Sequence, residues 1–463
     1  MWTDGLLRGC ASRREVLAAG ALGFGSLALR GVLSAEQGGQ APLRARAKRV
    51  IFLFMHGGPS QVDTFDWKPR LQADDGKPFP GERPRVVFAK TEALMASPFK
   101  FTQHGESGAW VSSLFPEVAK VADHLCFIKS LHGTNPAHGG ALLALHTGSD
   151  TFVRPSMGSW VSYGLGTENK DLPGFISICP TLGHGGVANW SNAFLPPEHQ
   201  GIPLGHAATK ARDVKFAFAS GGDAVLQAAE LDALRELNAQ HQVERQHDQA
   251  LAARISAMET AFRLQTAGAQ VLDLSGESAA TLASYGINEP TTENFGRQCL
   301  MARRFAEAGV RFIQCTHSYK WDQHEGLKRL HTNNAAEVDL PIAGLIRDLA
   351  ARDLLKDTLV LWAGEFGRTP TRQGGMGDAA GRDHNPHGFT VFMAGGGVKP
   401  GISYGATDDW GWFAAENKVH VHDLHATLLH ILGLDHEALT FRYAGRDFRL
   451  TDTAGRVVKD ILA

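Results

Sequence analysis

Short apolar runs alternate with stretches of helical periodicity along most of this chain. The first strong run is RVIFLFM at 49–55, and similar runs follow at 125–129, 174–179, 310–316, 359–363 and 390–394. Helical periodicity is clearest at 139–146, 157–164, 295–308, 334–352 and 423–432. A run that is apolar at every position is typical of a strand buried on both faces, as in a parallel sheet covered by helices. The pattern therefore predicts a three-layer α/β/α domain with a mainly parallel sheet.

One segment departs from this alternation. Residues from 222 to about 268 are rich in Ala, Leu, Glu, Gln and Arg, and they keep a helical period with no Pro or Gly between 223 and 265. Such a composition favours long helices with polar surfaces. We expect one or two surface helices inserted into the α/β domain.

The N-terminus has the features of an export signal. The sequence SRREVL at 12–17 precedes a weakly apolar stretch at 18–29 and a small-residue site that ends at Ala35, which is the pattern of a twin-arginine signal. The apolar stretch is far shorter than the roughly 20 residues that span a bilayer, so no membrane span is expected after cleavage. We expect a periplasmic or secreted protein with a signal peptide at 1–35, a linker at 36–48 and one α/β domain at 49–463.

Composition limits the classes of partner. The formal net charge is -2 and 20% of residues are charged, so a basic surface for nucleic acid is not expected. The 21 histidines are more informative, because histidine is a common metal ligand and many of these lie in motifs. The sequence contains no CxxC pair, so a thiolate metal site is not expected.

Polar, glycine-rich segments follow several of the predicted strands. The first strand ends in HGGPSQVD, which places His56 and Asp63 at its carboxyl end, where open α/β sheets bind ligands. A structural turn is the alternative. The HGG sequence also occurs in esterases, but the one G-x-S-x-G string, at 401–405, lacks the strand before it and the helix after it that a nucleophile elbow needs. A serine hydrolase is therefore disfavoured.

The segment LHGTNPAHGG combines histidines with the start of a predicted helix. It contains His132, Asn135 and His138, and the helix is predicted to begin at Gly139. The free N–H groups at a helix start favour an anion such as phosphate or sulfate. The alternative is a turn that caps a core helix.

Two later segments supply further candidate metal ligands. Asp322 and His324 follow the 310–316 strand and are two residues apart, which puts both on one face of an extended backbone. The segment GEFGRTPTRQGGMGDAAGRDHNPHG follows the 359–363 strand and contains Glu365, Arg368, Asp383, His384 and His387. Carboxylates and histidines of this kind bind Zn, Mn, Mg or Ca. A solvated loop with Asp–Arg pairs is the alternative.

These motifs together resemble a known family. MHGGPSQVDTFDWKP, WDQH, GEFGRTP and GRDHNPHGFTVFMAGGGVKPG, with the twin-arginine start, resemble the DUF1501 family, which is abundant in planctomycetes and is similar to the alkaline phosphatase and sulfatase superfamily. The resemblance implies an alkaline-phosphatase-like sheet with two neighbouring metal sites. Asp322 and His324 resemble the superfamily's Asp/His pair for one metal. Glu365 stands near the superfamily's later Asp-His pair, and His384 or His387 stands near its last histidine ligand.

The helix ALLALHTG resembles the sulfatase helix that ends in LLTG, and this places His138 where that superfamily has its nucleophile. The resemblance implies an exported metal-dependent hydrolase-like protein that acts on a phosphate or sulfate ester, small or polymeric, such as an ester of a polysaccharide. Paired divalent ions about 3.5–4 Å apart would clamp the ester. Arg368 would donate to the anion, and His138 would act as an acid/base or a further ligand. Because no Ser, Thr or Cys stands at His138, the alternative is a degenerate member that binds carbohydrate or a partner protein.

Overall fold

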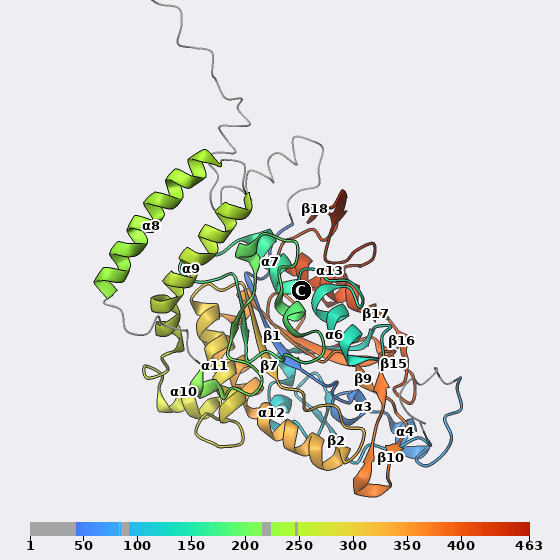
Figure 1. The fold of residues 1–463 in the computed structure, drawn as a ribbon. Coiled ribbons are helices and arrows are strands. Elements are labelled where there is room, and N and C mark those ends of the chain that lie inside the picture. Colours follow the sequence, from blue (N-terminus) through green and yellow to red (C-terminus); the bar gives the residue numbers. More distant parts are fainter. Residues whose placement is uncertain (1–42, 83, 85–91, 215–223, 246–248) are drawn as a thin grey trace, which may run out of the picture. The chain divides into compact units, whose positions relative to one another are not determined.

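The computed structural model describes residues 43–82, 84, 92–214, 224–245 and 249–463 (Figure 1). Residues 45–463 form one unit of the chain. The expected signal peptide and most of the expected linker lie outside the described residues.

The apolar runs form the centre of a nine-stranded sheet with the order β14-β4-β13-β8-β1-β7-β5-β6, in which β17 also pairs with β4. The strands are β1 (Arg49–Met55), β4 (Leu125–His132), β5 (Phe175–Ile178), β6 (Ile202–Leu204), β7 (Phe312–His317), β8 (Thr358–Ala363), β13 (Phe389–Ala394), β14 (Ile402–Tyr404) and β17 (Val419–His420). Each of the six predicted runs contains a strand, and the prediction of a mainly parallel sheet is confirmed.

One inner strand, β13, runs antiparallel to both of its neighbours, β4 and β8. A parallel connection needs a crossover that returns the chain to the other edge of the sheet. Residues 364–388, between β8 and β13, form short strands, turns and a three-residue 3-10 helix at Gly377–Ala379, with no such crossover helix. The chain therefore re-enters the sheet from the edge at which β8 ends.

Helices cover both faces of the sheet (Figure 1). Along β1, Leu53 and Met55 belong to the apolar cluster that includes α11 and α12, whereas Phe52 and Phe54 belong to the cluster that includes α6, α7 and α13. This alternation follows from the two-residue period of a strand. The helices are α6 (His138–Thr147), α7 (Met157–Leu165), α11 (Glu293–Glu307), α12 (Leu327–Ala351) and α13 (Val421–Ile431). The three-layer α/β/α prediction is confirmed.

The segment expected to hold inserted helices contains α8 (Ala224–Glu244) and α9 (Gln249–Leu272). Shorter helices are α3 (Gln61–Thr64), α4 (Pro69–Ala73), α5 (Pro116–Ala119) and α10 (Ala279–Ser284). Two-stranded sheets pair β2 (Phe101–His104) with β3 (Ala109–Ser112), β9 (Gly367–Arg368) with β12 (His384–Asn385), β10 (Gln373–Gly374) with β11 (Ala380–Gly381), β15 (Ala406–Thr407) with β16 (Ala414–Glu416), and β18 (Phe441–Tyr443) with β19 (Arg446–Phe448).

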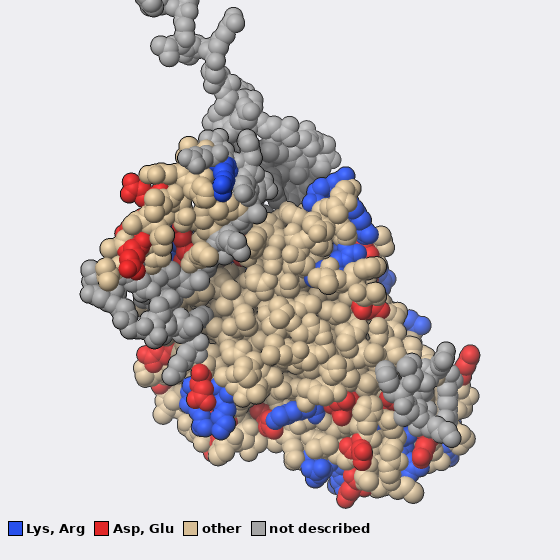
Figure 2. Space-filling view, in the orientation of Figure 1, with Lys and Arg blue, Asp and Glu red and all other residues tan. Residues whose placement is uncertain are grey.

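Acidic and basic side chains are interspersed around the rim of the face shown in Figure 2, and the middle of that face is mostly uncharged. Within the described part of the chain, no helix is both long and apolar enough to cross a membrane.

Candidate metal centre

Loops from the carboxyl ends of three strands meet the start of α6 at one edge of the sheet. His56 follows β1, Asp322 and His324 follow β7, and Glu365 follows β8. The strands end level with one another, because β1 pairs in parallel with both β7 and β8. The short strand β12, which begins at His384, pairs with β9 and so returns to the same edge. The expected convergence of distant segments is therefore observed.

The first group consists of Asp322, His324 and His384. The Oδ1 atom of Asp322 lies 2.9 Å from Nε2 of His324 and 3.1 Å from Nε2 of His384. The two Nε2 atoms lie 3.0 Å apart. Asp383 is next to this group, with its Oδ1 atom 3.8 Å from Nδ1 of His324.

The Nδ1 atoms of His324 and His384 both face hydrogen-bond acceptors. The Nδ1 atom of His324 lies 2.6 Å from Oε1 of Gln373, and Nδ1 of His384 lies 2.7 Å from the carbonyl oxygen of Pro136. Both partners are acceptors, so each Nδ1 carries a proton. When a ring is neutral its Nε2 presents a lone pair beside Asp322, as in a metal ligand, and when the ring is protonated its Nε2 donates to Asp322.

The spacing of this group fits a bound metal ion. Oxygen and nitrogen ligands that lie 2.0–2.2 Å from a common ion are roughly 2.8–3.6 Å from one another, with the shorter distances in octahedral and the longer in tetrahedral geometry. The three distances within the group are 2.9–3.1 Å, in the shorter part of this range. A neutral histidine whose other nitrogen donates to a carbonyl or amide oxygen is the usual form of a metal ligand.

The charge of the group is governed by Asp322. Burial acts to raise the pKa of Asp322, but hydrogen bonds from the neighbouring histidines and the charge of Arg368 outweigh it and hold that pKa far below its usual value. The hydrogen bond to Asp322 raises the pKa of His324, whereas burial lowers the pKa of His384. Asp322 thus stays ionised, and its carboxylate oxygens are available to a cation.

A second group surrounds His138, the first residue of α6. Its Nδ1 atom lies 2.6 Å from Oε1 of Glu365, and its Nε2 atom lies 3.2 Å from Oδ1 of Asp322, so His138 bridges the two groups. The ligand atoms of His56, His138 and His184 lie within 4.8 Å of one another. The Nε2 atom of His56 is 3.2 Å from Nδ1 of His184, and burial lowers the pKa of His56 to about 4.

His184 was not among the residues selected from the sequence. It lies in the loop after β5, between Gly183 and Gly185, with a φ of 46°. A glycine-flanked histidine after a buried strand is the signal that selected His56, so the same rule would have found His184. Tyr319 was also missed; its hydroxyl donates to Oδ2 of Asp322.

Gly57 allows two parts of this centre to approach each other. Its φ is +118°, and a Cβ atom there would lie 2.7 Å from the backbone nitrogens of Trp321 and Asp322. The N–H group of Gly57 donates to both carboxylate oxygens of Glu365, at 2.9 and 3.1 Å. Only glycine meets both the backbone conformation and the close approach.

Arg368 lies in a different environment from the one expected. It is fully buried, and its guanidinium donates to Oδ1 of Asp322 at 2.7 Å and to the carbonyl oxygens of Gly58 and Trp321 at 3.0 and 3.2 Å. These donors face protein groups, because the β9–β12 pairing buries the side chain under Asp322. Arg368 therefore positions a carboxylate, and the expected contact of its donors with a substrate anion is corrected.

Asp63 is held in a buried ion pair. Both Asp63 and Arg382 are fully buried, and the guanidinium donates to the two carboxylate oxygens at 2.6 and 3.1 Å. Ser60 Oγ also donates to Asp63, at 2.5 Å. The expectation that Asp63 is a metal ligand is therefore corrected, since its lone pairs are occupied by arginine and serine donors.

His387 and His132 lie apart from both groups. They line a separate cavity of about 280 Å³, and the His387 ring packs at 5.5 Å from that of Phe413. His384 lies in β12, which ends at Asn385, whereas His387 lies in the bend that follows this strand. His387 thus does not join the His384 group, and His132 is not beside it as a substrate contact.

Asn135 and Gly139 shape the start of α6. Asn135 Oδ1 accepts from the backbone of Ala137 at 2.9 Å, and its Nδ2 lies 3.3 Å from Asp150. Gly139 lies in the first turn of α6, directly after His138. Among the described residues, no Ser or Thr hydroxyl and no Cys thiol bonds to His138, Asp322 or Glu365.

A family model described as "Protein of unknown function (DUF1501)" matches residues 47–462. No curated protein matches the sequence. Similar solved structures include the lipoteichoic acid synthase LtaP from Listeria monocytogenes, with 9% identity, a TM-score of 0.37 and coverage of 89% of this chain and 76% of that one.

The PsFucS1 sulfatase from Pseudoalteromonas sp. has 12% identity, a TM-score of 0.34 and coverage of 89% and 72%. The alkaline phosphatase from the Antarctic bacterium TAB5 has 12% identity, a TM-score of 0.33 and coverage of 78% and 94%.

Proposed function

The chain belongs to the DUF1501 family, and we propose that it is a metal-dependent hydrolase of a phosphate or sulfate ester. The observation that carries the proposal is the convergence of Asp322 Oδ1 with the Nε2 atoms of His324 and His384 within 3.1 Å, while both Nδ1 atoms face acceptors. Such a set binds a cation and is built at the sheet edge where α/β proteins hold their ligands.

We propose that Asp322, His324 and His384, with Asp383 beside them, hold one divalent ion. His56, His138 and His184, with Glu365, would hold a second. Bound Zn, Mn, Mg or Ca would supply Lewis acidity to an ester oxygen and would activate water. The donor sets mix imidazole with carboxylate, which suits Zn or Mn better than Ca.

The chain's own residues fix the geometry of this centre. The guanidinium of Arg368 donates a hydrogen bond to Oδ1 of Asp322 at 2.7 Å, which keeps the carboxylate directed at both histidines. Glu365 receives two hydrogen bonds from Gly57 and holds Nδ1 of His138, which sets the orientation of that ring. His138 is then placed between the two groups, where it would hold or move a proton at Nε2 or act as a ligand.

Elemental analysis tests whether the protein binds a divalent metal ion. We expect purified wild-type protein to retain at least one divalent ion per chain by elemental analysis, and we expect Asp322→Asn to weaken metal affinity by on the order of 100-fold. The matched control is Asp447→Asn, which makes the same change on the exposed hairpin β18–β19 and should leave metal content unchanged. A wild-type protein without affinity for divalent ions would end the proposal.

The turnover of model esters tests whether the metal-bound protein is a hydrolase. We expect turnover of p-nitrophenyl phosphate or p-nitrophenyl sulfate that is abolished by EDTA and by Asp322→Asn, and that is restored in the wild type by added metal. Because position 138 holds His and not Ser, Thr or Cys, the alternative is a degenerate member that binds carbohydrate or a partner protein. Retained metal with no hydrolysis of either class of ester would establish that rival.

We also propose that the protein acts in the periplasm or outside the cell. The support is the SRREVL motif and the apolar stretch that follows it. Fractionation of cells that express the full chain tests this, with Arg13→Lys/Arg14→Lys as the variant expected to remain in the cytoplasm.

A further inference from the structure

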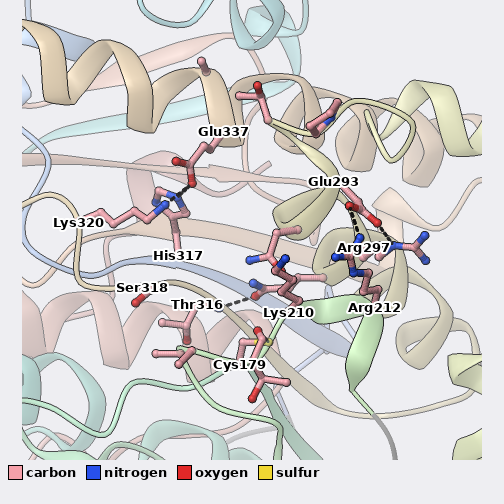
Figure 3. A pocket seen from close by; sticks show the side chains of 18 of the residues that line it. Cys179, Lys210, Arg212, Glu293, Arg297, Thr316, His317, Ser318, Lys320 and Glu337 are labelled. Carbon is pink, nitrogen blue, oxygen red and sulfur yellow. Dashed lines mark hydrogen bonds and ion pairs between the residues drawn. The ribbon is translucent and has the colours of Figure 1, made fainter.

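A cavity of about 870 Å³ lies between the loop after β7 and the helices α11 and α12 (Figure 3). Its walls come from the loop after β7, the start of α11, the middle of α12 and residues 207–212 in the loop after β6. It therefore opens at the carboxyl ends of β5, β6 and β7. A volume of this order is typical of sites for small organic molecules and exceeds what one ion requires.

The cavity and the metal centre draw on the same two loops. The loop after β7 contributes Ser318 and Lys320 to the cavity, and the same loop carries Asp322. Cys179 lines the cavity from the loop after β5, and His184 lies five residues later in that loop. A molecule in the cavity would thus contact loops that also carry residues of the metal centre.

Positive charge exceeds negative charge in the lining. The cations are Lys210, Arg212, Arg297 and Lys320, and the carboxylates are Glu293 and Glu337. Figure 3 shows Lys320 and His317 beside Glu337 at the left, and Arg212 and Arg297 beside Glu293 at the right.

Each of the two carboxylates contacts two side chains. Glu293 contacts Arg212 and Arg297, and Glu337 contacts His317 and Lys320. Arg212 lies 3.4 Å and Arg297 lies 3.2 Å from Glu293. Lys210 is labelled between these groups in Figure 3 and has no ion-pair partner among the described residues. Its ammonium is the charge most available to a ligand.

The remaining described residues that line the cavity are mostly polar, and none of them carries a large aromatic side chain. Among the described residues that line the cavity, none is Phe, Tyr or Trp, so a nucleobase would find no stacking surface. Gln298 is 2% exposed; its Oε1 accepts from Thr316 at 3.1 Å, and its Nε2 has no partner among the described residues. Hydroxyl and amide groups of this kind suit a polyol.

We propose that this cavity binds an anionic oligosaccharide, whose carboxylate or sulfate groups pair with Lys210 and the neighbouring arginines. The selection of esters rests on the proposed function, whereas the binding itself does not. The sugar hydroxyls would bond to Gln298, Ser318 and the other polar side chains of the lining. The cavity would thereby select esters that are part of a charged polysaccharide.

Titration calorimetry in the presence of EDTA tests the proposal without any turnover. The probes are trigalacturonate, sulfated maltotriose and uncharged maltotriose. We expect at least one anionic probe to bind about tenfold more tightly than maltotriose. The probe that binds identifies carboxylate or sulfate as the recognised group. Equal affinity for maltotriose, or no binding of any probe, would overturn the proposal.

Lys210→Glu supplies the variant, because Lys210 is exposed and holds no ion pair among the described residues. We expect it to weaken anionic binding about tenfold or more. Lys356→Glu is the matched control, since Lys356 precedes β8 at the opposite, amino edge of the sheet and is exposed. An unchanged affinity in Lys210→Glu, or an equal loss in Lys356→Glu, would contradict the assignment.

Asp322→Asn separates this inference from the proposed function. We expect it to lose metal but to keep its affinity for the anionic probe. A protein that binds the probe but never binds metal would support this inference and refute the hydrolase. A protein that binds metal and hydrolyses esters but binds no probe would do the reverse.

Discussion

Replacing Asp63 by asparagine separates two roles for this carboxylate, a metal ligand and the partner of a buried arginine. The structure supports the second role. Asp63 and Arg382 are both fully buried, and their two contacts measure 2.6 and 3.1 Å. Arg382 is also one residue from Asp383 and two from His384, so the pair anchors the segment that carries those side chains.

The magnitude follows from the charge that the substitution leaves behind. In Asp63→Asn the Arg382 guanidinium stays buried, and its remaining partners are the uncharged carbonyl oxygens of Thr369, Met95 and Ala96 at 3.3, 3.1 and 3.5 Å. Leaving one member of a buried pair without its countercharge costs about 3–5 kcal/mol. With an unfolding entropy of about 2.1 cal/mol/K per residue over roughly 420 residues, the melting temperature should fall by about 3–6 °C.

Urea unfolding and calorimetry of Asp63→Asn, Arg382→Met and the double variant measure this effect. We expect the double variant to be more stable than Asp63→Asn by at least about 1 kcal/mol, because no unpaired charge then remains. We also expect folded Asp63→Asn to bind metal as the wild type does. A loss of metal with a change in stability below about 1 kcal/mol would refute the ion-pair reasoning and restore Asp63 as a ligand.

Two further predictions concern acid stability and backbone packing. Burial lowers the pKa of His146 to about 4 and those of His331 and His425 to about 3, so the unfolded chain takes up their protons first as the pH falls below about 6.5. The free energy of unfolding should therefore drop by about 4 kcal/mol per pH unit near pH 5, and urea titrations that give equal stability at pH 7 and pH 5 would contradict this. Gly381→Ala would place a Cβ atom against the backbone carbonyl of His324, so we expect weaker metal binding with secondary structure retained. Metal affinity equal to that of the wild type would show that the loop adjusts without cost.

Most of the sheet could be read from the chain because its strands are buried on both faces. Each of the six apolar runs contains a strand, and β1 begins and ends at the predicted residues. The direction of β13 could not be read, since an apolar run looks the same in a parallel and an antiparallel strand. The missing crossover helix in residues 364–388 decides that direction.

The sequence by itself predicted the three-layer fold and seven of the residues that meet at one sheet edge, because polar residues that follow buried parallel strands emerge at the same edge. These are His56, His138, Asp322, His324, Glu365, Asp383 and His384. Only the tertiary structure decided which of the polar residues at that edge face one another. In the structure, Asp63 pairs with Arg382, and Arg368 is buried and donates to Asp322. His184 joins the group of His56 and His138. The physical reason is that a side chain's partner depends on register and loop course, which are set by contacts hundreds of residues apart in the chain and leave no local pattern.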